Sequence, residues 1–397
     1  MANEKRGPRI VYLVTEDWYF WTHRLRLALV MQNLGFEVYV MTKSGEYVKR
    51  MQELGLRVIP WKVSRAHRNP IRDLFALFQV ARVYWRLRPA IVHHIALKPI
   101  VLGGIVASLL DIPSVSAING LGHAFCTDST AIRAVRTAIL WLCRYVFQRN
   151  RSLAIFQNAT DRDLFVERGI IRADRAVMIP GGAGVDVNVF RPAPGTLRKP
   201  IVLLAARMLW EKGVGEFVQA AQNLKSRGKD ARFLLAGRVD QEAAAPISER
   251  QLRQWEETGA VEWLGHREDI LPLLREATVV VLPSYREGMP KILLEAAACG
   301  CPIITTDSPG CREVVDHGVN GLLVPPRDGQ ALADAIAILL DSPELCAEMG
   351  QASRKKAERE FSIDKVIERT IQMYARLMGR EFASHEVCAE TQSVAPA

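Results

Sequence analysis

The stretch that decides the fold is residues 10–42, which read IVYLVTEDWYFWTHRLRLALVMQNLGFEVYVMT. Residues 10–15 form a run rich in apolar and β-branched side chains, as expected for a buried strand. Residues 20–34 repeat apolar side chains at helical spacing and are followed by Gly35, a residue type that often terminates helices. Residues 37–42 are again strand-like. The segment therefore predicts a β-α-β unit of the kind that builds parallel sheets.

Short strand-like runs alternate with helix-length segments along the chain, in two series. The first series of strands is expected at residues 10–15, 37–42, 57–60, 90–93, 114–118, 154–157 and 177–179, and the second at 200–206, 232–236, 261–264, 278–282 and 302–305. This alternation predicts an α/β protein with two Rossmann-like, doubly wound parallel sheets, whose ligand crevices would face each other across a cleft. A chain of 397 residues that is 49% hydrophobic is large enough for two cores.

The expected domain boundary lies at a proline- and glycine-containing segment, Phe190–Thr196, which separates the two series and suits a linker. We expect an N-terminal domain over residues 1–194 and a C-terminal domain over residues 195–380, with a last helix able to pack back on the first domain. Residues 381–397 lose all periodicity, and we expect them to be a disordered tail.

Charge and cysteine content narrow the class of protein. The net charge is +9, and the excess of Lys and Arg falls within residues 1–190. A basic half suits nucleic acid, an anionic membrane or a phosphorylated substrate, but no nucleic-acid-binding module is visible. The seven cysteines are scattered without a C-x-x-C pair, which fits a reducing cytoplasm. No signal peptide is visible, and the longest apolar run has about half of the roughly 20 residues that a membrane span needs. We expect a soluble or peripheral protein.

The chemistry is concentrated in residues 282–326, which read LPSYREGMPKILLEAAACGCPIITTDSPGCREVVDHGVNGLLVPP. The pattern predicts the end of a strand, an irregular loop, and a helix with Pro290 in its first turn. The amides of Lys291, Ile292 and Leu293 would then lack intrahelical partners. Such amides, together with the helix dipole, can bind a phosphate.

Two carboxylates flank this helix start, since Glu287 precedes it and Glu295 lies inside it, so both can line one pocket. Their spacing resembles the signature of glycosyltransferase family 4, the retaining enzymes with the GT-B fold. The resemblance extends to Ala206-Arg207-x4-Lys212-Gly213, Pro309-Gly310-Cys311-Arg312-Glu313, Gly318-x-Asn320-Gly321 with Pro325, and the inter-domain segment Pro180–Asp186. It covers most of residues 180–375, whereas residues 1–179 are similar mainly in architecture.

The resemblance implies transfer of a sugar from a nucleoside-diphosphate sugar to a glycan hydroxyl, with retention of configuration. In the C-terminal domain it assigns catalytic roles to Arg207, Lys212 and Glu287, and donor binding to Gly288, Met289, Pro290, Lys291, Ile292, Glu295 and His266. The two cations would stabilise the diphosphate as it leaves. No protein nucleophile, cofactor or metal is implied. The triplet Asp161-Arg162-Asp163 has the form of a metal-binding D-x-D, but it follows Asn158 at an expected helix start, where Asp is common.

The acceptor is expected on the N-terminal domain. Many family members have a His-Gly pair after the strand corresponding to residues 114–118, whereas this chain has Asn119-Gly-Leu-Gly-His123. Either Asn119 or His123 is therefore expected at the reacting centre.

The loop after the first strand is unusually aromatic. We expect Trp18, Phe20 and Trp21 to pack into the core, and His23 is able to touch an acceptor phosphate.

A basic, aromatic helix is expected between residues 129 and 150. Its predicted core stripe is Ile132, Val135, Ile139, Leu142 and Val146, and its other face carries Arg133, Arg136 and Arg144 with Trp141 and Tyr145. This face suits an anionic bilayer on the inner side of the cytoplasmic membrane, although an ordinary solvated basic face has the same pattern. The phrases Arg286–Lys291 and Asn119–Gly122 resemble the subgroup that acts on polyprenyl-diphosphate-linked sugars in surface polysaccharide assembly.

Two alternatives stay open at this stage. A sugar-nucleotide epimerase on the same fold would need one donor and no acceptor. A non-catalytic, membrane-docked subunit would bind the nucleotide sugar without releasing the sugar.

Overall fold

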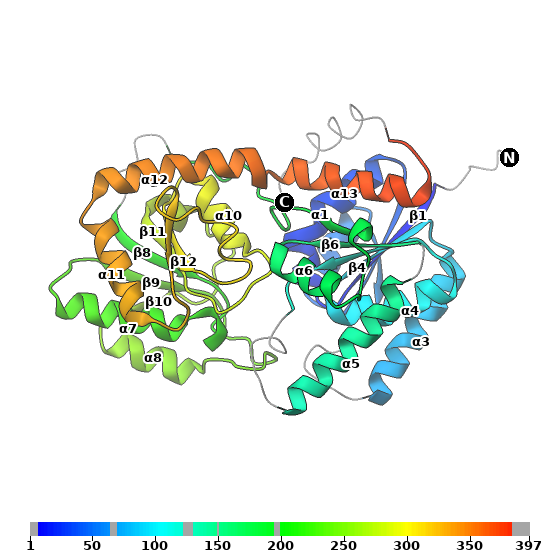
Figure 1. The fold of residues 1–397 in the computed structure, drawn as a ribbon, viewed down its shortest axis with the longest axis horizontal. Helices are drawn as coiled ribbons and strands as arrows, with labels where there is room; N and C mark the ends of the chain where they lie inside the picture. The colour runs from blue at the N-terminus through cyan, green and yellow to red at the C-terminus, as the bar shows by residue number, and fades with distance from the viewer. Residues whose placement is uncertain (1–6, 64–69, 122–129, 149–150, 194–198, 383–397) are drawn as a thin grey trace. The chain divides into compact units, whose positions relative to one another are not determined.

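The computed structural model describes residues 7–63, 70–121, 130–148, 151–193 and 199–382. The chain divides into two compact units (Figure 1), of which unit 1 is Met1–Ala183 with Asp364–Ala397 and unit 2 is Gly184–Ile363. The expected linker position near residue 195 and most of the expected tail lie outside the described residues.

Unit 1 is built on a seven-stranded parallel sheet with the strand order β3-β2-β1-β4-β5-β6-β7. Its strands are β1 (Arg9–Val14), β2 (Glu37–Thr42), β3 (Arg57–Pro60), β4 (Ile91–Ile95), β5 (Ser114–Ile118), β6 (Ser152–Phe156) and β7 (Ala176–Met178). Its helices are α1 (Asp17–Asn33), α2 (Val48–Glu53), α3 (Pro70–Leu87), α4 (Leu97–Leu109), α5 (Thr130–Phe147), α6 (Ala159–Glu167) and the short η2 (Ala173–Arg175). The order reverses between β1 and β4, and ligand crevices form at such switch points, outside the carboxyl ends of the strands.

The last helix, α13 (Ile363–Met378), completes unit 1 from the far end of the chain. The Tyr374 side chain is fully buried, and its hydroxyl lies 2.5 Å from Nδ1 of His93 on β4. At the other end of the helix, the Asp364 carboxylate pairs with Arg26 of α1 at 3.0 Å. These contacts bind α13 to the sheet and to α1.

Unit 2 has a six-stranded parallel sheet with the order β10-β9-β8-β11-β12-β13. Its strands are β8 (Lys199–Ala205), β9 (Arg232–Ala236), β10 (Glu262–Trp263), β11 (Ala277–Leu282), β12 (Ile303–Thr306) and β13 (Gly321–Val324). Its helices are η3 (Trp210–Lys212), α7 (Val214–Ser226), α8 (Glu249–Glu257), α9 (Leu271–Glu276), α10 (Lys291–Ala298), α11 (Gly329–Leu340), α12 (Pro343–Lys356) and the π-helical η4 (Ala357–Phe361). The edge strand β13 is absent from the strands predicted above.

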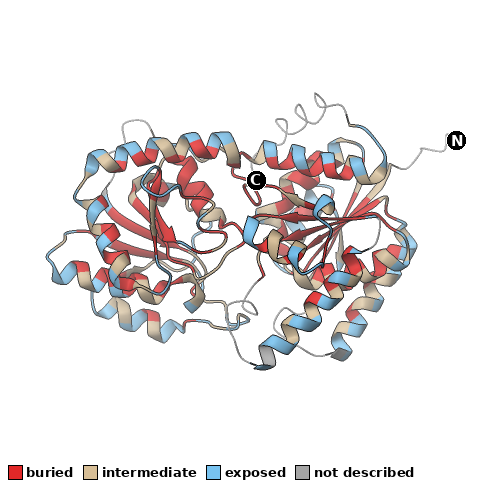
Figure 2. Cartoon of the chain, viewed as in Figure 1, coloured by how far each residue is buried: buried red, intermediate tan, exposed pale blue. Residues whose placement is uncertain are grey.

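Each sheet is buried on both faces, as the red strands of Figure 2 show. Along β8, Val202 and Leu204 pack into one hydrophobic cluster, whereas Ile201 and Leu203 pack into a second. Because successive side chains of a strand point to opposite faces, a strand covered by helices on both sides reads as a continuous apolar run. The predicted α/β architecture of two doubly wound parallel sheets is confirmed.

Helix α5 differs from the prediction in which side chains it buries. Of the predicted stripe, Val146 is buried, and the side chain of Ile132 lies outside the described part. The others, Val135, Ile139 and Leu142, are only partly covered. The buried face is completed by Leu140, Cys143 and Phe147. Among the helices that the structure describes, none has the length and apolar character required to cross a bilayer.

Candidate functional site

The predicted catalytic residues of unit 2 follow two neighbouring strands. Arg207 and Lys212 come after β8, and Glu287 comes after β11, which pairs with β8 in parallel. Because the carboxyl ends of parallel strands meet at one edge of a sheet, these residues reach the same edge.

Lys212 and Glu287 form an ion pair across this edge. The ammonium group of Lys212 contacts Oε1 of Glu287, and the side chains are 15% and 13% exposed. The same Oε1 accepts a hydrogen bond of 2.7 Å from the hydroxyl of Ser284, a fully buried residue. Burial, followed by the negative charge of Glu287, raises the pKa of the Cys311 thiol to about 11. The structure therefore presents Lys212 and Glu287 as one preorganised polar group.

The loops that carry this pair touch each other through their backbones. Gly213, which joins η3 to α7, has a φ of 71°, and a Cβ there would lie 2.2 Å from the carbonyl oxygen of Pro283. The amide of Tyr285 donates to the carbonyl of Glu211 at 3.0 Å. A side chain at position 213 would push the two loops apart, so the Lys212-Gly213 sequence is a condition for the ion pair.

The Pro309–Glu313 motif contacts the backbone of Glu287. The Glu287 amide donates to the Pro309 carbonyl at 2.9 Å. A Cβ on Gly310, whose φ is +85°, would lie 2.3 Å from the Glu287 carbonyl oxygen. Glu313 closes the turn by accepting from the Gly310 amide at 2.7 Å. In this structure the motif holds the backbone of Glu287 in place.

Helix α10 begins one residue later than predicted. Pro290 is its N-cap with a ψ of 116°, and the helix starts at Lys291 without a side-chain cap. The amide of Leu293 donates to the carbonyl of Pro290 at 3.0 Å, so the prediction that this amide is free was wrong. Lys291 and Ile292 remain as the first two amides of the helix, where no intrahelical acceptor can reach.

The other predicted donor-binding residues lie around this helix start. Glu295 is buried and pairs with Lys291 at 3.1 Å. Gly288 is buried in the loop, and Met289 and Ile292 contribute to the hydrophobic cluster beneath α10. Glu295 is thus held by the side chain one helical turn before it, with its charge already compensated.

Arg207 is held by a loop of the next strand. Its guanidinium pairs with Asp240, which follows β9, at 2.6 Å. The backbone between these loops is continuous with the sheet, since the Met208 amide donates to the Arg238 carbonyl at 3.0 Å. His266 is exposed in the loop after β10, again at the carboxyl edge. Asp240 and Ser284 are polar contacts that the sequence patterns did not indicate.

In unit 1, Asn119 lies directly after β5, and His123 lies outside the described residues. The Asn119 carbonyl oxygen accepts from Nε2 of Gln157 at 2.8 Å and from the guanidinium of Arg24 at 3.3 Å. Gln157 follows β6, the neighbour of β5, and Arg24 comes from α1. The sequence patterns singled out neither Arg24 nor Gln157.

The aromatic start of α1 is only partly in the core. Phe20 is fully buried, as predicted, but Trp18 and Trp21 are half-buried. His23 stacks on Tyr19 with ring centroids 4.0 Å apart. Aromatic rings therefore remain accessible beside the carboxyl edge of the sheet.

The D-x-D triplet lies at a helix start, as its sequence context indicates. Asp161 is buried in the first turn of α6, where its amide donates to Oδ1 of Asn158 at 2.8 Å and one of its carboxylate oxygens accepts from Nδ2 of Asn158 at 3.1 Å. Asp163 pairs with Arg162 at 2.7 Å.

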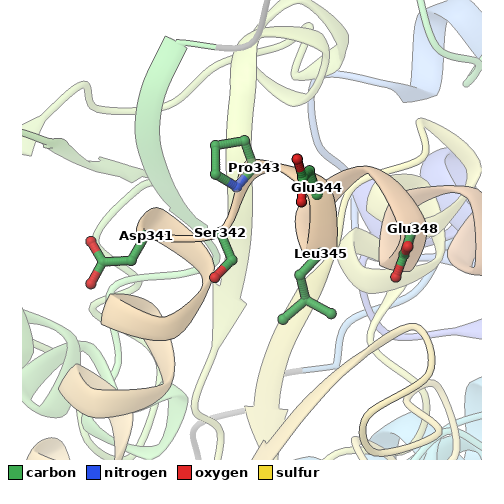
Figure 3. A pocket seen from close by; sticks show the side chains of 6 residues that line it. All are labelled: Asp341, Ser342, Pro343, Glu344, Leu345 and Glu348. Atoms are coloured by element: carbon green, nitrogen blue, oxygen red, sulfur yellow. The ribbon is translucent and has the colours of Figure 1, made fainter.

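A separate hollow of about 530 Å³ lies at the turn between α11 and α12 (Figure 3). Its acidic lining includes Asp341, Glu344 and Glu348. None of the predicted site residues lines it.

Two sequence-family models match the chain. Residues 9–158 match the family described as "Glycosyl transferase 4-like", and residues 199–342 match "Glycosyl transferases group 1". The chain is a family 4-like glycosyltransferase. The expected family is thereby confirmed, and the two matched segments fall in unit 1 and unit 2 respectively.

Two curated relatives of this glycosyltransferase act in bacteria. One is the N,N'-diacetylbacillosaminyl-diphospho-undecaprenol alpha-1,3-N-acetylgalactosaminyltransferase of Campylobacter jejuni, 28% identical over 93% of this chain and 99% of that protein. Another is the UDP-Gal:alpha-D-GlcNAc-diphosphoundecaprenol alpha-1,3-galactosyltransferase of Escherichia coli, 26% identical over 77% of this chain and 80% of that protein.

Solved structures share the GT-B fold of this glycosyltransferase. Anabaena HepE in complex with UDP-glucose superimposes with a TM-score of 0.74 at 19% identity, over 93% of this chain and 100% of that chain. Sucrose-phosphate synthase from Thermosynechococcus elongatus gives a TM-score of 0.75 at 20% identity, over 94% and 99% of the two chains. At these identities the likeness concerns the fold.

Proposed function

We propose that the enzyme transfers a sugar from a nucleoside-diphosphate sugar with retention of configuration, and that the donor diphosphate binds at the carboxyl edge of the unit 2 sheet. The observation that carries this proposal is the Lys212–Glu287 pair, held by Ser284 and by the backbone contact at Gly213. A cation placed on rigid loops needs no reorganisation when negative charge develops on a leaving group.

In this proposal each site residue of unit 2 has a separate role in donor binding or sugar transfer. Lys212 and Arg207 neutralise the departing diphosphate, and the first amides of α10 add to this. The Glu287 carboxylate orients the ammonium group and accepts from sugar hydroxyls, while Glu295, beside Lys291, accepts from the ribose. The diphosphate is a good leaving group, so neither carboxylate is required as a nucleophile, and the incoming hydroxyl attacks from the face that the diphosphate leaves. We propose that the reaction needs no metal.

Two measurements test the donor proposal. A thermal-shift screen with a panel of nucleotide sugars should identify one donor that raises the melting temperature of the wild-type enzyme more than that of Lys212→Met. With that donor, NMR of the freshly formed product should show the anomeric configuration of the donor. An inverted product, or donor stabilisation that is equal in Lys212→Met, would refute the proposal.

We propose further that the acceptor is a polyprenyl-diphosphate-linked sugar in surface polysaccharide assembly. The two bacterial relatives named above act on undecaprenyl-diphosphate-linked substrates, as their names state. Such an acceptor is anchored in a bilayer, so the enzyme has to work at a membrane surface.

Unit 1 offers a surface suited to that membrane. Helix α4 packs between α3 and α5, and the three helices lie side by side in Figure 1. On α3, the side chains of Ala76, Val80 and Tyr84 enter the core, yet the same helix exposes Ile71, Leu74, Phe75, Phe78 and Trp85. Ile71 is 78% exposed and Phe78 is 64% exposed. So many large apolar side chains on one exposed helix mark an interaction site.

The neighbouring helix α5 adds charge to this apolar surface. Trp141 is 67% exposed, Arg133 and Arg144 are exposed, and Arg136 is half-exposed. Apolar and aromatic side chains with arginines suit the interface of an anionic bilayer. We propose that α3 and α5 together dock the enzyme on the inner face of the cytoplasmic membrane. The exposed apolar side chains of α3, which no sequence pattern indicated, supply the apolar part of this surface.

Vesicle binding tests the docking proposal. Each arginine near an anionic surface contributes about 1 kcal/mol, so Arg133→Gln, Arg136→Gln and Arg144→Gln together should weaken binding to anionic vesicles by about 3 kcal/mol. Phe75→Ser with Phe78→Ser should also weaken it, with less dependence on salt. The matched control, Arg50→Gln, Lys355→Gln and Arg369→Gln, removes the same charge from exposed positions on α2, α12 and α13.

The α5 triple variant and the α3 double variant should lose transfer to a polyprenyl-linked acceptor in vesicles. Their transfer to a short water-soluble acceptor should change little. Equal vesicle binding by the α5 triple variant and the control triple variant would refute docking through α5. An equal effect on both acceptors would refute membrane docking and indicate that the basic face of α5 is an ordinary solvated surface.

A further inference from the structure

The carboxyl edge of the unit 1 sheet contains a buried arginine. Arg24 lies in the second turn of α1 and is 5% exposed. Its guanidinium donates to Oδ1 of Asn119 and to the backbone carbonyl of His23, each at 3.3 Å. Asn119 and Gln157 directly follow two paired strands, so the guanidinium lies where parallel sheets form their ligand crevices.

The charge of Arg24 has no counter-charge in the described chain. Both of its hydrogen bonds go to neutral carbonyl oxygens, and no described carboxylate forms an ion pair with it. This contrasts with Arg26 on the same helix, which pairs with Asp364. A buried charge is costly unless an opposite charge compensates it. The folded protein therefore carries a cost at Arg24 that a bound anion would offset.

Donor atoms beside Arg24 are also unused. The Nε of Arg24 and the Nδ2 of Asn119 are buried and have no hydrogen-bond partner among the described residues. The Asn119 carbonyl oxygen is already occupied by Gln157 and Arg24, which directs the free end of the amide away from them. Two free N–H donors next to an uncompensated positive charge form the donor set that an oxyanion requires.

Three buried titratable groups that feel the charge of Arg24 do not supply a negative charge either. Burial, followed by the nearby Arg24 and His94, lowers the pKa of His93 well below its usual value, so this ring is neutral. Burial raises the pKa of Tyr12 and of Tyr374 well above the usual range, so both hydroxyls stay protonated. The side chains of His93, Tyr12 and Tyr374 are therefore neutral and do not compensate the charge of Arg24.

We propose that Arg24 and the amide of Asn119 bind a phosphate group of the acceptor at the carboxyl edge of the unit 1 sheet. This inference rests on the proposed function, because a diphosphate-linked acceptor is the substrate that brings a phosphate to unit 1. Arg24 contacts the substrate in this arrangement, whereas Gln157 is a positioning residue that holds Asn119. The half-buried rings of Trp18 and Trp21 leave apolar surface nearby for a sugar face.

Direct binding of inorganic pyrophosphate tests the site without turnover. The measurement uses isothermal titration of the full chain carrying Arg207→Gln and Lys212→Gln, which removes the two cations proposed to neutralise the donor diphosphate. In this background Arg24→Met should lower pyrophosphate affinity at least tenfold, and Arg24→Lys should keep part of it because the charge remains. Arg168→Met, at an exposed position of the same unit, should change nothing. No binding by the background protein, equal affinity in Arg24→Met, or Arg24→Lys binding no better than Arg24→Met would each overturn the proposal.

Stability and kinetics separate this role from a structural one. If Arg24 is kept for a ligand, Arg24→Met should leave the melting temperature unchanged or raise it, because an uncompensated buried charge is removed. A lower melting temperature with unchanged pyrophosphate affinity would assign Arg24 a structural role. In turnover, Arg24→Met should raise the KM for a diphosphate-linked acceptor about tenfold. The KM for the nucleotide sugar should stay constant, as should the KM for the same sugar as a methyl glycoside. A raised KM for the nucleotide sugar alone would assign the phosphate to the donor and overturn the proposal.

Discussion

Removing the ammonium group of Lys212 should reduce both stability and activity, and a second substitution should restore only the stability. Lys212 and Glu287 are 15% and 13% exposed, so their pair lies between a surface pair and a fully buried one. Surface pairs contribute about 0–1 kcal/mol, and breaking a buried pair costs about 3–5 kcal/mol. For Lys212→Met we expect a loss of about 2 kcal/mol in the free energy of unfolding, because the Glu287 carboxylate loses its cation and keeps the hydrogen bond from the neutral hydroxyl of Ser284. In the double variant with Glu287→Gln, no uncompensated charge remains, and about 1–2 kcal/mol should return as coupling energy.

Activity should follow a different rule. Loss of a charge-assisted contact to the diphosphate costs about 1.5–3 kcal/mol of binding to the leaving group, or roughly 10- to 150-fold in kcat/KM. Glu287→Gln does not replace the missing cation, so the double variant should be no more active than Lys212→Met. Urea denaturation and initial rates with the identified donor provide the two measurements. Activity of Lys212→Met within threefold of wild type, under about 1 kcal/mol, would refute the diphosphate assignment, and a double variant as unstable as the single one would refute the pairing.

Three further predictions concern the backbone at Gly213, the metal requirement and the buried thiol of Cys311. Gly213→Ala should lower stability and activity together, because its Cβ would lie 2.2 Å from the Pro283 carbonyl oxygen. The control Gly228→Ala, at a φ of 76° with no atom within 4 Å of its Cβ, should cost only the left-handed strain of about 1–2 kcal/mol and no activity. Equal activity losses in the two variants would contradict this account. Transfer should persist in excess EDTA, and a complete loss restored by magnesium or manganese would point to a metal role for Asp161 and Asp163. The pKa of Cys311 is raised from 9.0 to about 11 in the folded state, so the stability contributed by its neutral thiol is complete below pH 9 and is lost as the pH rises toward 11. Between these pH values the free energy of unfolding should fall more steeply in wild type than in Cys311→Ser, and identical slopes would show that this thiol does not titrate as described.

Much of the architecture could be predicted because strand and helix periods are local. The bounds of β2, β3, β5 and β9 agree with the prediction residue for residue. The strand β13 was missed because it begins at Gly321, within a glycine-rich turn, and glycine is depleted in strands. Helix α5 was misjudged for another reason: it carries more apolar residues than one stripe needs, so the sequence alone does not determine which of them face the sheet.

The candidate site shows the same limit. The sequence indicated Lys212 and Glu287 separately, because each belongs to a recognisable motif, but their contact joins positions 75 residues apart. Arg24 is 95 residues from Asn119 and is one of many arginines in a basic half. Only burial distinguishes it from those on the surface, and burial depends on how α1 packs over the strand ends. The exposed stripe on α3 was hidden because an apolar residue in a helix is normally assigned to a core.

The position of α13 has a consequence for how the protein is made. Unit 2 is synthesised completely before the helix that carries Tyr374. The sheet of unit 1, by contrast, is synthesised first and lacks that helix until all of unit 2 has been made. Until then His93 lacks its contact with Tyr374, and the apolar side chains that α13 covers in unit 1 stay exposed to chaperones and proteases. A nonsense mutation shortly before Ile363 would thus leave unit 2 nearly whole while damaging unit 1, although no residue of the N-terminal sheet had changed. A substitution in α13 therefore acts on the first unit of the enzyme, although in the sequence the helix follows the second.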